Sequence, residues 1–259
     1  MVVRRWRPEK LTLTAIYQDE HLVAIDKPPG LLVHRTQLAA HEDQAALQLL
    51  RDQLGQPVWP VHRLDRGTSG VLLFALSAEV ASLLGTMFEQ GGMEKRYLAL
   101  VRGWPGEDEG LIDHPLARDP ELPSAGQTML AAQTRWRVLE RIEWSVTTDP
   151  RFPTTRVALL QAEPLQGRRH QIRRHLKHIA HPILGDATHG KGPLNRAVGA
   201  WLGVNRLWLH AQQLVLRHPV SGAALTLEAA VGAAWPPAPA SGRECAAAHP
   251  AHPAAGWPR

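Results

Sequence analysis

Apolar and polar positions along the chain predict many short strands and a few helices. Residues 71–76 form a continuous apolar run, which is typical of a strand covered on both faces. In residues 134–138, arginines alternate with Thr134, Trp136 and Val138. This period of two is typical of a strand with two different faces. Similar patterns predict further strands at 12–17, 22–26, 95–102, 156–161, 207–216 and 225–230. The first two of these are expected to pair as a hairpin.

Helical spacing appears between the strands. Leucines three and four residues apart, followed by Gly55, predict a helix over 45–54. Ser77 is a residue type that favours the N-cap position, and it precedes a helix predicted over 78–90 that the pair Gly91-Gly92 ends. Because strands and helices interleave without regular βαβ spacing, the chain is expected to have a mixed α+β fold.

The two ends of the chain differ in composition from the middle. Residues 1–13 carry several arginines and are interpreted as a basic extension before a domain at 14–231. Residues 236–259 contain 6 prolines and 8 alanines among 24 residues, which leaves little to bury and no regular period. We therefore expect residues 232–259 to be a disordered Pro/Ala-rich tail.

Composition narrows the class of protein. The chain has 259 residues, is 44% hydrophobic and carries a formal charge of +5, so it can bury a core and its charge favours an anionic partner. A single cysteine excludes a scaffold held by internal disulfides. The first residues lack the apolar stretch of a signal peptide, and no segment approaches the roughly 20 apolar residues of a membrane span. The sequence therefore predicts a soluble cytoplasmic protein.

Residues 61–70 place Asp65 between Arg63 and Arg66 in a glycine-containing segment just before the apolar strand. In one interpretation Asp65 is a turn acid paired with a neighbouring arginine. In the other, the strand holds Asp65 at the mouth of a cleft, and the arginines attract a phosphate backbone. Spacing alone does not choose between them.

A second polar segment, 164–185, contains no acidic residue and many basic ones. Ile172, Leu176 and Ile179 fall at helical spacing, so a helix here would bury them and project cations around its other sides. Solvated charged faces normally mix both signs, whereas this one is uniformly positive, which favours a nucleic acid partner. The basic residues are Arg168, Arg169, Arg173, Arg174 and Lys177, interleaved with His170, His175, His178 and His181.

Metal and nucleotide cofactors are not expected. The histidines lack the His-Glu-x-x-His pattern, although a metal-dependent nuclease that uses them with Asp186 is one alternative. Phosphate-loop and dinucleotide-binding glycine patterns are missing from the sequence. Tyr97, one of two tyrosines, follows two cations and is suited either to stacking on an unpaired base or to packing within a strand.

Four motifs in order resemble the RluA-type pseudouridine synthases. The segment 62–70, His-Arg-Leu-Asp-Arg-x-Thr-Ser-Gly, is similar to that family's signature, and 26–30, 95–97 and 167–173 are similar to its turn, tyrosine and arginine motifs. With 182–186 and 209–211, the resemblance covers roughly 14–231. Departures are Asp26 for asparagine, Pro29 for serine, and Gln166 where the family usually has threonine.

The resemblance implies a mainly antiparallel central sheet flanked by helices, with an active-site cleft across it. It implies an isomerase that acts on RNA without a cofactor or metal. Asp65 would either attack the sugar C1′ or remove a sugar proton, Arg173 would pair with Asp65, and Tyr97 would stack on the extruded uracil. Arg63 would fill the gap left by the base, and Ile172 would line the pocket. The other residues expected to contact substrate are His62, Arg66, Arg168, Arg169, Arg174 and Lys177.

Segments 32–35 and 152–156 resemble the family members that modify uridine 65 in the T-stem of tRNA. That substrate is therefore expected, with ribosomal RNA as the alternative and a non-catalytic RNA-binding protein on the same scaffold as a rival. A monomer is expected.

Overall fold

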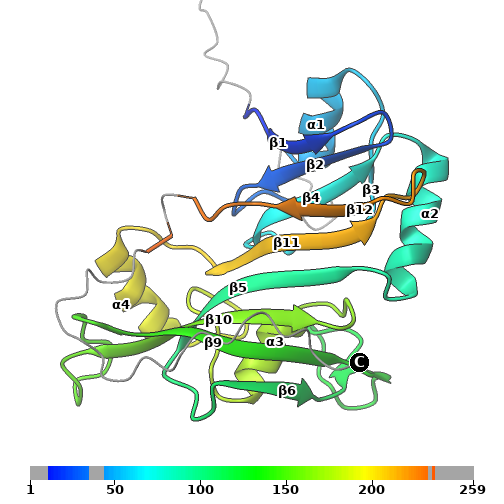
Figure 1. The fold of residues 1–259 in the computed structure, drawn as a ribbon. Helices are drawn as coiled ribbons and strands as arrows, with labels where there is room; N and C mark the ends of the chain where they lie inside the picture. Colours follow the sequence, from blue (N-terminus) through cyan, green and yellow to red (C-terminus); the bar gives the residue numbers. More distant parts are fainter. Residues whose placement is uncertain (1–10, 35–43, 233–234, 237–259) are drawn as a thin grey trace, which may run out of the picture.

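A ten-stranded mixed sheet forms the centre of the molecule (Figure 1). The computed structural model describes residues 11–34, 44–232 and 235–236. The strands are β1 Thr14–Gln18, β2 Leu22–Lys27, β3 Trp59–Pro60, β4 Ser69–Ala75, β5 Glu94–Arg102, β6 Glu109–Asp113, β7 Leu116–Ala117, β8 Met129–Leu130, β9 Gln133–Trp144, β10 Thr155–Pro164, β11 Leu209–Arg217 and β12 Ala224–Glu228. The helices are α1 Ala46–Leu54, α2 Ala78–Glu89, α3 Gln171–His178 and α4 Gly192–Leu202.

The order of strands is β1-β2-β4-β11-β5-β10-β9-β6, with β3 pairing β4 and β12 pairing β11. Among the described strands, the β4–β11 pair is parallel and the other pairs are antiparallel. This confirms the predicted α+β class with a mainly antiparallel sheet.

Strand β11 joins the two halves of the sheet, because β4 and β5 each pair with it and not with each other. Gly70 makes the close approach to β4 possible. Its φ is +105°, and a Cβ there would lie 2.2 Å from the carbonyl oxygen of Ala211. Only glycine accommodates both this backbone angle and this contact.

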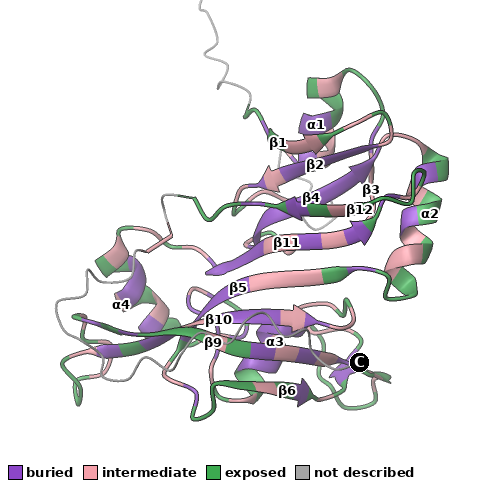
Figure 2. Cartoon of the chain, viewed as in Figure 1, coloured by how far each residue is buried: buried purple, intermediate pink, exposed green. Residues whose placement is uncertain are grey.

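Strands β2 and β4 in the first half of the sheet are buried on both faces (Figure 2). Along β2 and β4, successive side chains enter two different clusters: Val23 and Leu72 pack with α1, and Leu22 and Leu73 pack with α2. The continuous apolar run of β4 therefore has the cause predicted from the sequence. In the second half, α3 and α4 pack with β5 and β10 in one cluster, which contains the fully buried Trp208.

Most predicted elements agree with the observed ones to within a few residues, but β9 runs six residues past the predicted end at 138, and β3, β6, β7, β8 and α4 were not predicted. Ser77 caps α2, and its hydroxyl accepts the backbone N–H of Val80. One expectation about α3 was wrong: its cations do not all project outward. Arg173 and His175 are buried, and their polar atoms form hydrogen bonds within the protein. Ile179 follows the last helical residue instead of lying inside the helix.

The ends of the chain are only partly described. Leu13, in the predicted basic extension, is buried, and its N–H donates to the side chain of Gln53 in α1. Trp235, in the predicted tail, packs edge-on against Trp208. Residues 1–10 and 237–259 lie outside the described residues. None of the helices in the described ranges is long and apolar enough to cross a membrane.

Candidate active site

Asp65 lies in the loop that leads into β4, and a neighbouring turn holds this loop in place. The carbonyl oxygen of Arg66 accepts the N–H of Gly30 at 2.9 Å and the ammonium of Lys27 at 3.2 Å. The same Lys27 Nζ also donates to the carbonyl oxygens of Pro28 and Leu31, each at 2.8 Å. Lys27 is fully buried, and burial lowers its pKa to about 7. The turn at 27–30 therefore fixes the backbone next to Asp65.

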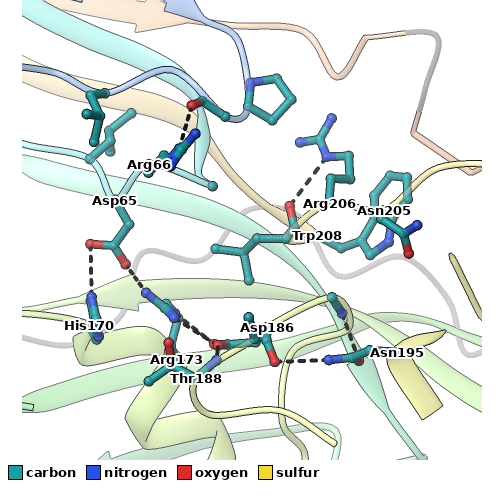
Figure 3. A pocket seen from close by; sticks show the side chains of 18 of the residues that line it. Asp65, Arg66, His170, Arg173, Asp186, Thr188, Asn195, Asn205, Arg206 and Trp208 are labelled. Carbon is teal, nitrogen blue, oxygen red and sulfur yellow. Dashed lines mark hydrogen bonds and ion pairs between the residues drawn. The ribbon is translucent and has the colours of Figure 1, made fainter. Parts of the chain in front are cut away.

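Arg173 bridges two carboxylates (Figure 3). Its Nη1 donates to Asp65 Oδ2 at 2.8 Å, while Nε and Nη2 donate to the two oxygens of Asp186 at 2.7 and 2.8 Å. Burial alone would lower the pKa of Arg173, but its hydrogen bonds and the charges of Asp186 and Asp65 outweigh burial and raise it. A lysine could not reproduce this arrangement, because it lacks the planar fork of donors.

Asp186 is itself held rigidly. One of its oxygens accepts the backbone N–H groups of Thr188 and His189, each at 2.9 Å. Burial raises the pKa of a carboxyl, but here the hydrogen bonds and charge of Arg173, with the two backbone donors, lower the pKa of Asp186. Asn195 in α4 donates to the carbonyl oxygen of Asp186 and accepts the N–H of Gly185, both at 2.9 Å. This chain of contacts connects α4 to Asp65 through Arg173.

Two cavities meet at the Asp65–Arg173 pair. The smaller, of about 440 Å³, is lined by Tyr97, Ile172, Leu209 and His62 among other residues. Burial, with a contribution from the charge of Asp65, raises the pKa of Tyr97, so its hydroxyl stays protonated at neutral pH. This cavity places the ring of Tyr97 and the side chains of Ile172 and Leu209 beside a carboxylate, which suits a planar heterocycle.

The larger cavity, of about 1120 Å³, lies on the other side of the pair and is rich in arginine. Arg63 is exposed, lines both cavities, and makes no hydrogen bond or ion pair with any residue in the described part of the chain. The cavity is also lined by Arg66, Arg169, Arg196 and Arg206. A polyanionic strand fits this lining, since each phosphate could be met by a guanidinium.

The predicted contact residues divide into two groups. Asp65, Arg173, Tyr97, Arg63, Ile172, His62, Arg66, Arg168 and Arg169 line one or both cavities. Arg174 and Lys177 line neither: Arg174 donates to the carbonyl oxygen of Ala117, and Lys177 is exposed on α3.

The basic segment is partly neutralised inside the protein. Arg169 forms ion pairs with Asp119 and Glu121 from the β7–β8 connection, in addition to the pairing of Arg173 with Asp65 and Asp186. Asp119 and Glu121 were missed because they are distant in sequence from Arg169. The positive charge of this segment is thus not by itself evidence of a nucleic acid partner.

Sequence reasoning also missed the supporting residues of the site. Asp186 was considered only as a metal ligand, but both of its oxygens accept hydrogen bonds from Arg173. In the described ranges, no group of three or more His, Cys, Asp or Glu side chains could hold a metal ion. No local sequence pattern marks Asn195 and His189 as site residues. Only their closeness in sequence to the 182–186 motif indicated a place near the site.

The chain matches the family model described as RNA pseudouridylate synthase over residues 21–178. It is 46% identical over 236 residues to a protein of Pasteurella multocida (strain Pm70) named tRNA pseudouridine synthase C, covering 87% of this chain and 94% of the relative. It is 44% identical over 228 residues to the protein of the same name in Vibrio cholerae serotype O1, covering 86% and 93%.

Solved structures show the same fold. Human RNA Pseudouridylate Synthase Domain Containing 1 superimposes with a TM-score of 0.68 at 24% identity, covering 88% of this chain and 86% of that one. Human RNA Pseudouridylate Synthase Domain Containing 4 gives a TM-score of 0.62 at 26% identity, covering 85% and 89%. The sheet and its helices are therefore shared with these proteins.

Proposed function

The chain belongs to the RNA pseudouridylate synthase family, and we propose that within this isomerase family it converts uridine 65 in the T-stem of tRNA to pseudouridine. The name shared by its relatives at 44–46% identity supports tRNA as the substrate. The observation that supports the site assignment is the Asp65 carboxylate, paired with Arg173 at 2.8 Å where the cavity that contains Tyr97 meets the larger arginine-rich cavity.

The reaction moves the ribose C1′ from N1 to C5 of uracil, so atoms are rearranged and none is lost. A glycosidase commonly needs two carboxylates because it must activate water and protonate a leaving group. Here the detached base returns as the nucleophile, so one carboxylate suffices and no redox or energy cofactor is required. Asp65 acts either on C1′ or on a sugar proton, and both routes need its ionised form.

Arg173 serves this chemistry by fixing the carboxylate of Asp65 through the hydrogen bond from its Nη1. A uridine within a stem must first rotate out of the stack, which costs a few kcal/mol. In our proposal Arg63 occupies the vacated position, Tyr97 stacks on the extruded uracil, and Ile172 forms the wall of the pocket. These three residues line the smaller cavity together with Asp65.

The arginine-rich cavity would take the phosphate backbone next to the target. Arg66 and Arg169 line this cavity and Arg168 lines the smaller one, so their guanidinium groups fit this contact. His62 is neutral and would contact the substrate from the wall of the smaller cavity. Arg174 and Lys177 would reach only RNA that extends past α3. The single cysteine suits a reducing compartment, and our proposal is a monomer that acts in the cytoplasm without a metal.

Pseudouridine mapping of tRNA and ribosomal RNA from cells with and without the protein tests the function and the position together. We expect one tRNA site, position 65, to depend on the protein. Loss of a ribosomal site instead would reject the tRNA assignment.

The role of Asp65 is tested with purified protein. Asp65→Asn should reduce isomerisation of a tRNA transcript by at least about 10⁴-fold while RNA binding survives. Asp113→Asn is a matched control, since Asp113 is exposed on β6 and lines neither cavity. Substantial pseudouridine formed by Asp65→Asn, measured by mass spectrometry, would refute the assignment.

A further inference from the structure

His170 lies next to the Asp65 oxygen that Arg173 leaves free, and His189 contacts His170. His170 Nε2 lies 3.8 Å from Asp65 Oδ1, and Figure 3 shows the ring facing the carboxylate. On the other edge of the ring, His170 Nδ1 lies 3.0 Å from His189 Nε2. The three groups thus form a line from His189 through His170 to the carboxylate.

The backbone holds His170 in an uncommon conformation. Its φ is 55°, in the left-handed region, where non-glycine residues are rare and cost of the order of 1 kcal/mol or more. His170 precedes α3 without capping it through its side chain. In this conformation the imidazole points toward Asp65 and not toward the start of α3. The strained backbone of His170 therefore orients its side chain toward the site.

The hydrogen bond between the two rings fixes which nitrogens carry protons. Of two neutral imidazole nitrogens 3.0 Å apart, one donates and the other accepts. If His170 donated from Nδ1, its Nε2 lone pair would face the negative Asp65 carboxylate. If His189 donates from Nε2, the proton of His170 sits on Nε2 and faces Asp65. Electrostatics favours the second arrangement.

The charges around the pair allow this neutral arrangement. The groups that face the histidines are Asp65 from the loop before β4, Asp186, Arg169, and from α3 Arg173 and Lys177. Burial lowers the pKa of His189 to about 4 and also lowers the pKa of His170 against the opposing effect of Asp65. Both rings are therefore neutral near pH 7.5. Their tautomers determine whether an N–H donor or a nitrogen lone pair faces Asp65.

We propose that His170 and His189 are positioning residues for Asp65: His189 donates from Nε2 to His170 Nδ1, and His170 presents its Nε2–H to Asp65 Oδ1. Arg173 holds the opposite oxygen, so the carboxylate is fixed from both sides. The 3.8 Å separation is longer than a hydrogen bond, and contacts of this kind tighten when substrate binds. The catalytic part of this inference rests on the proposed function, whereas the tautomer part does not.

The tautomers are read by nuclear magnetic resonance on ¹⁵N-histidine-labelled protein at pH 7.5. The His170→Asn and His189→Gln variants assign the two ring signals, and asparagine tolerates the left-handed backbone. We expect the Nε2–H tautomer at both positions in the unmodified protein. An Nδ1–H or a doubly protonated His170 would overturn the proposal, whether or not the protein acts on RNA.

The catalytic effect is read from single-turnover rates. His189→Gln keeps an N–H donor toward His170 and should stay within about threefold of the unmodified rate. His189→Leu has no donor and should slow isomerisation about 10- to 100-fold, since small errors in the position of a reacting group cost this much. RNA affinity should be the same in both variants, because His189 is 9% exposed and acts through His170.

Equal rates for the two variants, or a loss of affinity instead of rate, would contradict the positioning role. The unmodified protein is assayed in the same series. If it forms no pseudouridine in any RNA, the proposed function fails, and the resonance experiment still decides the tautomers.

Discussion

His62 is held neutral by its surroundings. Its Nε2 accepts the backbone N–H of Leu73 at 3.0 Å, and its ring stacks on Phe88 at 5.1 Å. Burial, with a smaller effect from Lys95, lowers the pKa of His62 to about 4 from 6.5. A protonated ring would have to break the bond to Leu73, because both of its nitrogens would then be donors.

This pKa predicts how stability depends on pH. Between pH 6.5 and 4 the unfolded chain binds a proton at His62 and the folded protein does not, so stability falls as the pH is lowered through this window. The contribution lost is about 3 kcal/mol across the window. Denaturant unfolding at several pH values measures it.

His62→Gln is the control for that measurement. Glutamine keeps an acceptor for the N–H of Leu73 but does not titrate. The free energy of unfolding of the variant should therefore fall less steeply as the pH is lowered, by the contribution of His62. An identical slope in both proteins would mean that His62 does not cause the acid destabilisation.

Asp65, Arg173 and Tyr97 were identified from short motifs that resemble a known family, and the structure brings Asp65 and Arg173 into contact. The residues that support them were not identified, since His189 and Asn195 act through contacts that depend on how the chain returns to the site. The spacing of residues along the chain shows which side chains are available. It does not show which distant acid pairs with which arginine.

Most elements were predictable because their patterns are local. Ser77 shows this for a helix start, and the apolar run of β4 shows it for a strand buried on both faces. The position of β11 between β4 and β5 was not predictable, since pairing between distant strands leaves no periodic signal. The need for glycine at position 70 follows from that pairing and was missed with it.

The β4–β11 contact gives a prediction at the level of the strands. Gly70→Ala would place a methyl group against the carbonyl oxygen of Ala211 and force a side chain into a φ of +105°. We expect a loss of more than about 3 kcal/mol in the free energy of unfolding. Denaturant titration followed by circular dichroism measures the loss.

Gly85→Ala provides a matched control, because Gly85 lies in α2 and a Cβ there would meet nothing within 4 Å. This change should stabilise the protein by about 0.5–1 kcal/mol, since alanine favours the helix. Similar stability in the two variants would show that β11 does not pack against β4 as closely as the structure indicates.

At the scale of the whole molecule, some cationic side chains are paired with acids and others are not. Arg169 is occupied by two acids, whereas Arg63 lines both cavities and is exposed. Removing Arg63 should weaken RNA binding and flatten the dependence of log K on log salt by about 0.7–0.9, the effect of removing one cation from the RNA interface.

Arg217→Ala is the matched change for Arg63→Ala. Arg217 ends β11, away from the Ser69–His210 pairing near the site, and donates to the carbonyl oxygen of Gly222. Its removal should leave the salt slope unchanged in filter-binding titrations over a range of salt concentrations. A slope that is the same for both variants would place Arg63 outside the RNA contact.

The place of β11 in the sheet has a consequence for synthesis. Asp65 leaves the ribosome long before residues 209–217, and at typical translation speeds the interval is on the order of 10 s. Until the late strand inserts, the two parts of the sheet carry unpaired edges and no shared scaffold orients the carboxylate toward its guanidinium. We therefore expect a nascent or truncated chain that lacks β11 to be inactive.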